Sequence, residues 1–127
     1  MAVAYQVGAI HSTTFTGYRH GSQTTLDSTR DKLINEVGGD FIVTAGKTLY
    51  ISRVGLWNRC VTTNIIIYLM YDDDGAGTNQ VVVGTWCVGD ETLVNLPLII
   101  IIPAGKYVTA KSSSDEVGAI YVEGFEV

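Results

Sequence analysis

The chain has 127 residues, a formal net charge of −5 and only 8 Lys or Arg side chains. A nucleic-acid partner is excluded, because neutralising phosphates requires clustered basic residues. The longest apolar runs are too short to cross a bilayer, and the first ten residues lack the basic start and long apolar core of a secretion signal. The sequence therefore predicts no membrane partner, and folding in a cytoplasm.

Composition predicts the fold class. Val, Ile and Thr together supply 41 of the 127 residues, with 14 Gly and only 2 Pro. Side chains branched at Cβ are stiff and pack well on a pleated surface, and Gly serves the turns between short strands. The length fits one domain with its own apolar core. We expect an all-β protein, either a sandwich or a barrel.

The N-terminal third has no strand-like pattern. Residues 1–30 are polar and keep neither a two-residue nor a 3.6-residue period, so they predict an irregular arm, and the arm with a first turn is expected over residues 1–39. Within the arm, Asp27 or Ser28 could cap a single helical turn that the glycines after Val37 would end. The domain proper is expected over residues 40–127.

From Asp40 onward, strand patterns are separated by short turns. About eight antiparallel strands are expected, as in a sandwich. One expected strand, over residues 48–57, changes phase: Leu49 and Ile51 share one face, while Val54 and Leu56 share the other. A β-bulge near residues 52–53 would restore one inward face. The clearest strand patterns are at residues 40–45, 48–57, 62–71, 80–88, 92–102, 106–113 and 118–127.

The phrase Ala-Gly-Lys occurs twice, at residues 45–47 and 104–106. Each copy ends one β-rich stretch and starts another. Gly46 and Gly105 can adopt a positive φ without a steric penalty, so each phrase predicts a turn. Two similarly built halves suit a jelly roll made of two Greek-key elements.

Two strands are apolar on both faces. In "IIIYLMY" and "LIIII" successive residues are all apolar or aromatic, so one set can fill the core while the other needs a second cover. The chain offers no helix for that purpose. We therefore expect a homo-oligomer, although the N-terminal arm could cover the same face. The predicted subunit interface consists of Ile66, Tyr68, Met70, Ile99 and Ile101.

No catalytic or cofactor site is predicted. The run "DDDGAGTN" departs from a calcium loop, because Ala76 stands at a ligand position and Val83 replaces the bidentate Glu. His11 and His20 lie in the predicted arm, away from a rigid scaffold or nucleophile. Cys60 and Cys87 are expected to be buried and reduced, the alternative being a disulfide. We predict that the protein is not an enzyme and holds no cofactor or metal.

The stretches "TAGKTLYIS" and "IPAGKYVTAK" resemble small jelly-roll virion proteins of tailed bacteriophages, namely capsid decoration (cement) proteins. The resemblance covers residues 40–127 in pattern. It implies a homotrimer on the outer capsid, assembled in the host cytoplasm, that bridges major capsid subunits and stabilises the head. It also makes residues 2–30 the candidate capsid-contact segment, with contacts expected at Tyr5, Tyr18, Arg19 and His20.

A second interpretation remains open. Trp57, Trp86 and the tyrosines could instead belong to a receptor- or carbohydrate-binding tip domain of a phage tail or head fibre. The binding loops would then lie around residues 57–59 or 72–79. A sugar-binding platform of exposed aromatic rings would distinguish this function from a decoration protein.

Overall fold

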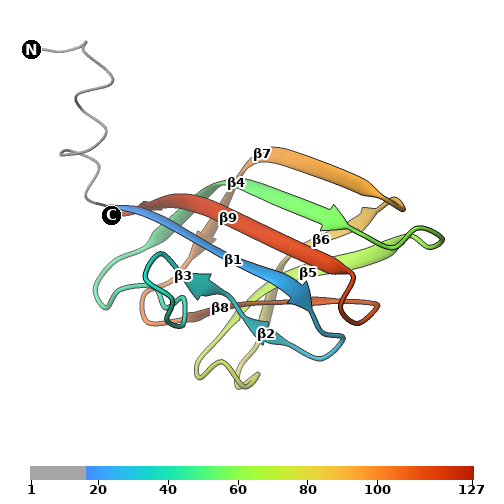
Figure 1. The fold of residues 1–127 in the computed structure, drawn as a ribbon. Helices are drawn as coiled ribbons and strands as arrows, with labels where there is room; N and C mark the ends of the chain where they lie inside the picture. Colours follow the sequence, from blue (N-terminus) through green and yellow to red (C-terminus); the bar gives the residue numbers. More distant parts are fainter. Residues whose placement is uncertain (1–16) are drawn as a thin grey trace, which may run out of the picture.

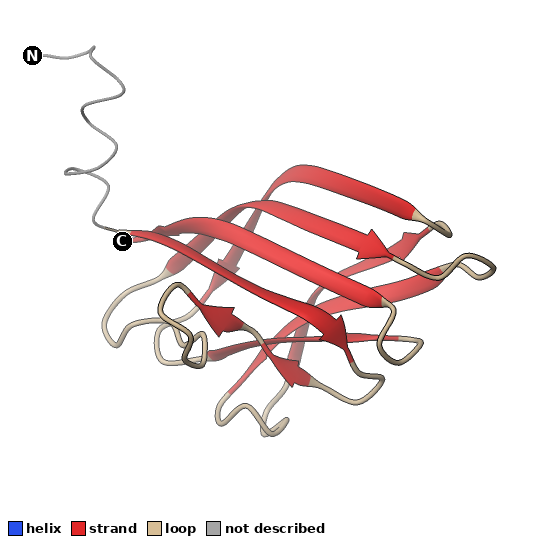
Figure 2. Ribbon diagram, viewed as in Figure 1, coloured by secondary structure: helices blue, strands red, loops and turns tan. Residues whose placement is uncertain are grey.

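The computed structural model describes residues 17–127, and every regular element within them is a β-strand (Figure 2). The strands form two antiparallel sheets that pack face to face as a β-sandwich (Figure 1). The strands of this part of the chain are β1 (Tyr18–Leu26), β2 (Asp31–Lys32), β3 (Ile34–Asn35), β4 (Leu49–Asn58), β5 (Ile65–Asp72), β6 (Val81–Val88), β7 (Thr92–Ile102), β8 (Tyr107–Ser112) and β9 (Gly118–Glu126).

The two sheets interleave along the sequence. The five-stranded sheet has the order β3-β1-β9-β4-β7, and the four-stranded sheet has the order β2-β8-β5-β6. Consequently β7 and β6 are edge strands, and they lie near each other at one side of the sandwich. Figure 1 shows the end of β9 beside the start of β1, where the N–H of Glu126 donates to the carbonyl of Gly17.

The core lies between the sheets and follows the alternation of the strands. On β5, Ile65 and Ile67 are buried while Ile66 is exposed. On β4 the expected bulge is confirmed, because the pairing shifts between Ile51 and Arg53. The shift keeps the apolar residues on both sides of it in the core.

Gly124 on β9 makes this bulge possible. A Cβ there would lie 2.0 Å from the carbonyl oxygen of Tyr50 and 2.7 Å from the Cα of Ile51. Backbone atoms cannot yield as a flexible side chain can, so only glycine permits β4 and β9 to approach so closely.

Both Ala-Gly-Lys phrases form turns, as predicted. Gly46 and Gly105 each have φ of 77°. The two phrases also meet in space: the N–H of Val43 donates to the carbonyl of Lys106, and the N–H of Gly105 donates to the carbonyl of Val43. The repeated phrase therefore marks two turns at the same end of the sandwich.

The predicted irregular arm is wrong for residues 17–39. These residues supply β1, β2 and β3, and no helical turn forms after Asp27. The strand β1 was missed because Leu26, at its last position, is the one large apolar residue of this strand that is buried in the core. Gly21 is also buried, so close to the ring of Phe41 that a Cβ would clash with it.

Two smaller expectations are also corrected. Residues 40–45 do not form a regular strand but make isolated bridges, Ile34 to Asp40 and Ile42 to Tyr107. Phe41 is nevertheless buried. Cys60 and Cys87 are both free thiols, but Cys60 is half-buried and Cys87 is exposed, because its position on β6 faces away from the core.

Candidate interaction surface

The outer face of the five-stranded sheet carries a row of exposed apolar side chains. One residue comes from each of four neighbouring strands, and the pairing register aligns them side by side. Their exposed fractions run from 36% to 54%. We call this set the apolar row; it consists of Tyr18, Phe125, Tyr50 and Ile101.

The apolar row points outward because its neighbours along each strand point inward. Leu49 and Ile51 are buried on either side of Tyr50, and Ile102 is buried beside Ile101. The rings of Tyr18 and Phe125 meet edge to face, with centroids 5.7 Å apart. Cross-strand aromatic pairs of this kind stabilise a sheet even in water.

Ile99 extends the apolar row along the edge strand β7. The register between β4 and β7 shifts between residues 97 and 100 of β7. Leu98 and Ile100 pack against the core, whereas Ile99 is 78% exposed. The whole of β7, Thr92–Ile102, contains no charged residue. Edge strands discourage pairing with another chain through charges, prolines or bulges; β7 lacks the charges but carries Pro97 and the register shift, so the unprotected part of this edge lies toward Ile102.

A polar network lies beside the apolar row on the same face. The carboxylate of Glu123 accepts from Arg53 and from the hydroxyl of Tyr121, both at 2.9 Å, and from Tyr18 at 3.3 Å. Burial disfavours the charged form of Glu123, but these donors outweigh it and hold its pKa below the ordinary value. Burial, with the hydrogen bonds to Tyr18 and Glu123, raises the pKa of Tyr121. Both groups are fixed in place by their partners.

A groove of about 370 Å³ lies farther along the same face. It forms because large and small outward residues alternate across the strands. Gly55 sits opposite both Tyr121 and Asn95, and Ala119 sits opposite Trp57. The short residues leave a hollow that Trp57, Tyr121 and Asn95 border.

Trp57 is held from behind by Arg59. The guanidinium carbon lies 5.0 Å from the centroid of the indole ring, and Nη2 of Arg59 donates to the carbonyls of Thr24 at 2.7 Å and Glu116 at 3.1 Å. The indole is still 44% exposed. An exposed aromatic ring on a rigid strand is a surface suited to stacking contacts.

The predicted subunit-interface residues do not form one surface. Ile99 and Ile101 lie on the outer face of the five-stranded sheet, but Ile66 and Tyr68 lie on the outer face of the other sheet. Tyr68 is half-buried beneath Lys111, whose nitrogen is 4.9 Å from the ring centroid. Met70 is fully buried within the chain, so it presents no surface to a partner.

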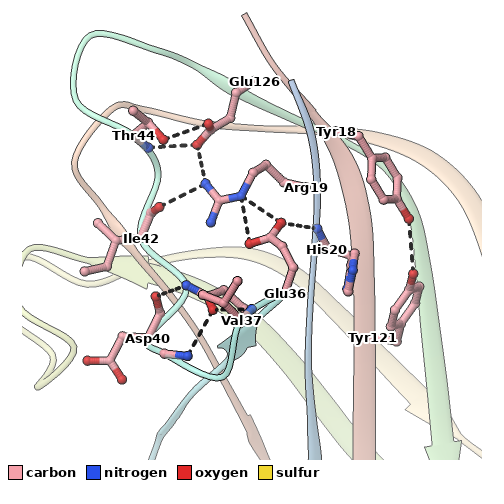
Figure 3. Close-up of polar contacts among 12 residues, drawn as sticks. Tyr18, Arg19, His20, Glu36, Val37, Asp40, Ile42, Thr44, Tyr121 and Glu126 are labelled. Atoms are coloured by element: carbon pink, nitrogen blue, oxygen red, sulfur yellow. Dashed lines mark hydrogen bonds and ion pairs between the residues drawn. The ribbon is translucent and has the colours of Figure 1, made fainter. Parts of the chain in front are cut away.

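The predicted capsid-contact residues also separate. Tyr5 lies outside the described residues. Tyr18 and His20 face outward from β1, near Tyr121. The Arg19 side chain points to the other side, between Glu36 and Glu126 (Figure 3).

Arg19 is committed to contacts inside the sandwich. Its side chain is only 13% exposed and is ion-paired to Glu36 at 2.9 Å and Glu126 at 2.6 Å. It also donates to the carbonyl of Ile42. Figure 3 shows that the carboxylate of Glu126 also accepts from the N–H of Thr44. Burial lowers the pKa of Arg19, but its two carboxylate partners outweigh that effect and raise it overall. Its role is to connect β1, β9 and the segment before the first Ala-Gly-Lys turn.

In the acidic turn after β5, backbone N–H groups of the turn itself donate to the carboxylate of Asp72. Asp72 is fully buried, and its carboxylate accepts from the N–H groups of Asp74, Gly75 and Gly77. Arg30 lies 3.6 Å from the same carboxylate. Within residues 17–127, no cluster of His, Cys, Asp or Glu is arranged to hold a metal ion.

Sequence reasoning missed Tyr50 and Phe125 as surface residues. Each stands at an ordinary alternating position of a strand, where one face is expected to be wet. A signal was present: β4 and β9 carry aromatic residues at several outward positions where polar residues would be expected. The sequence predicts Trp57 in a binding loop, whereas the structure places it on β4 at the border of the groove.

The comparisons with known proteins give no indication of the function. No protein-family model and no curated protein sequence matches the chain. Among the described residues there is also no helix of the length and apolarity needed to cross a membrane. The surface features above are therefore the basis for a functional proposal.

Proposed function

We propose that the chain is a structural protein of a tailed-phage virion, a homotrimeric capsid decoration protein that associates through the outer face of its five-stranded sheet. The observation that carries the proposal is the apolar row together with Ile99. Monomers rarely expose such a contiguous apolar face, and this one continues to an uncharged edge strand.

The strand order supports a jelly roll as the finer description of the sandwich. If the short β3 is set aside, the first strand pairs with the last, β1 with β9, and the second with the second last, β2 with β8. Next come β4 with β7, and finally β5 with β6. A long antiparallel ribbon wrapped into two sheets produces this nesting, as expected for a double Greek key.

The apolar row supports association between copies of the chain. The number of copies, three, and the capsid as a partner are implied by the sequence resemblance. A shell-binding protein needs two surfaces, one for its own copies and one for the major capsid protein. The apolar row and Ile99 suit the first. His20 and the segment containing Tyr5 are the candidates for the second, because Tyr18 already belongs to the apolar row.

Light scattering at two protein concentrations tests the association. A mass of three chains that does not change with concentration is expected. A monomer at both concentrations would contradict the proposal, since the apolar row would then be tolerated in water.

Capsid binding requires a separate experiment. Removal of residues 2–30 would delete β1, so the appropriate variant lacks only residues 2–16 and keeps the whole sheet. This variant is expected to retain its oligomeric mass but to lose co-sedimentation with phage heads. Undiminished co-sedimentation would remove the N-terminal segment, including Tyr5, from the capsid contact.

A further inference from the structure

We propose that the groove beside Trp57 is a binding site for a neutral pyranose sugar. This goes beyond a decoration role, which requires no small ligand. The groove starts at Tyr121, whose hydroxyl lies 3.4 Å from that of Tyr18 in the apolar row, and extends along the sheet to Trp57. Trp57 and Tyr50 stand seven residues apart on the same strand, about 23 Å at the usual rise, so the Trp57 end of the groove lies outside the apolar row.

The first argument is the aromatic wall. A pyranose has one face of C–H groups that packs against an aromatic ring, and the indole is the largest such ring available. Trp57 is backed by Arg59, which two backbone carbonyls hold in place. One face of the ring is therefore occupied from within the protein, and the position of the ring is fixed before any ligand arrives. A preorganised ring loses little entropy on binding.

The second argument is the presence of unused polar groups at the border of the groove. The side-chain amide of Asn95 and the hydroxyl of Ser22 form no hydrogen bond with any residue of the described chain. An amide offers a donor and an acceptor in one plane, which suits two adjacent sugar hydroxyls. Asn95 and Ser22 flank the row that contains Gly55 and Tyr121, so they approach the groove from opposite sides.

The third argument concerns charge and size. All residues that line the groove belong to the described part of the chain, and none of them carries a charge. The guanidinium of Arg59, 5.0 Å from the indole centroid, donates to the carbonyls of Thr24 and Glu116. A charged sugar would gain no ionic partner from the lining residues, whereas a neutral one needs none. The volume of about 370 Å³ lies within the usual range for small-ligand sites. An apolar side chain of a partner protein would also fit the hollow, but it would leave Asn95 and Ser22 unsatisfied.

Saturation-transfer NMR on the full chain tests the site directly. The probes are methyl glycosides of glucose, galactose, mannose and N-acetylglucosamine, with methyl glucuronide as the charged comparison. At least one neutral glycoside is expected to receive saturation, most strongly at its ring C–H protons, while the glucuronide receives none. Absence of transfer to every neutral glycoside would overturn the proposal.

Two substitutions locate the binding. Trp57→Ala is expected to weaken it by at least about tenfold through loss of the stacked ring. Asn95→Ala changes an exposed side chain on an edge strand, keeps the fold, and should weaken binding by about fivefold through loss of its hydrogen bonds. Tyr68→Ala, which removes an aromatic ring from the opposite sheet, is the matched control. Binding that survives both groove substitutions would place the sugar elsewhere and overturn the proposal.

The oligomeric mass separates this proposal from the proposed function. Trp86→Phe leaves Trp57 as the only tryptophan, so its fluorescence reports on the groove alone. A fluorescence change with glycoside at constant mass is expected. If the fluorescence instead follows protein concentration and ignores every glycoside, the groove receives a neighbouring chain, and the sugar site is excluded whatever the mass.

Discussion

The outer faces of the two sheets are both rich in apolar residues, but they differ in how far the chain covers those residues. On the four-stranded sheet, Met70 is fully buried and Asp72 draws the following turn onto the surface, where Gly75 lies against Lys32 and Tyr107. On the five-stranded sheet, the side chains of the apolar row are 36% to 54% exposed. The four-stranded sheet is thus covered by its own chain around Met70, although Ile66, Val81 and Val82 stay exposed, while the apolar row crosses four strands of the other sheet.

The comparison shows why apolar alternation alone does not identify an interface. Ile66 and Ile99 both belong to runs of consecutive apolar residues, yet Ile66 is 37% exposed and Ile99 is 78% exposed. The difference lies in what surrounds them: Ile66 stands on an inner strand of its sheet, between β8 and β6, while Ile99 stands on an edge. Exposure is set by neighbours that are distant in sequence.

The largest expected effect concerns the five-stranded sheet, which carries the apolar row. Gly124→Ala places a Cβ within 2.0 Å of the backbone of β4, so β4 and β9 must separate. We expect a loss of about 4 kcal/mol in the free energy of unfolding, measured by urea denaturation. Gly39→Ala is the control, because the nearest atom to its Cβ would be 3.6 Å away. Equal stabilities of the two variants would contradict the tight approach of β4 and β9.

The second effect separates the two faces as association surfaces. The double substitution Ile99→Lys with Ile101→Lys is expected to remove about 3 kcal/mol of association free energy per subunit, because two buried isoleucines would become buried lysines. The light-scattering mass should fall to that of a monomer. Val61→Lys alters a loop valine that is 62% exposed and should leave the mass unchanged.

Ile66→Lys completes that comparison on the opposite sheet. We expect the oligomer to survive this substitution, since the apolar row is untouched. Dissociation by Ile66→Lys, but not by the double substitution, would move the interface to the four-stranded sheet.

The third effect tests how Asp72 holds the turn after β5 against the four-stranded sheet. Asp72→Ala leaves three backbone N–H groups of the acidic turn without their acceptor and Arg30 without its carboxylate. We expect a loss of about 2 kcal/mol in unfolding free energy. Asp90→Ala, in an exposed turn, is the control. A stability unchanged by Asp72→Ala would show that the turn needs no carboxylate to stay on the sheet.

The smallest effect is a pH dependence at the β1 side of the five-stranded sheet. Burial of Glu36 raises its pKa, but hydrogen bonds from Arg19 and from backbone N–H groups outweigh burial and lower the value overall. A depressed pKa in the folded state means that this stabilisation is present above the unfolded value and is lost as pH falls through the folded value.

Unfolding measured between pH 7 and pH 3 should therefore show a loss that Glu36→Gln reduces by about 0.5 kcal/mol. Glu91→Gln, an exposed carboxylate in the turn before β7, serves as the comparison. Identical pH profiles for Glu36→Gln and the unaltered chain would argue against a contribution from the Arg19–Glu36 pair.

The sequence by itself determined the strands from β4 to β9, both Ala-Gly-Lys turns and the bulge on β4. These features depend on local properties: β-branched residues, glycines at positive φ, and a change of phase between Ile51 and Val54. Such preferences act over a few residues, so they can be read without knowing the neighbours. The existence of surplus apolar residues was also readable, because no amphipathic pattern accommodated them.

Only the tertiary structure decided where those residues lie. The nine-residue β1 depends on Gly21 meeting the ring of Phe41, and Arg19 is withdrawn from the surface by Glu36 and Glu126. The apolar row exists because β1, β9, β4 and β7 align in one register, although β1 and β9 are separated by most of the chain. Contacts between such distant segments depend on the whole chain packing at once, and no local pattern encodes them.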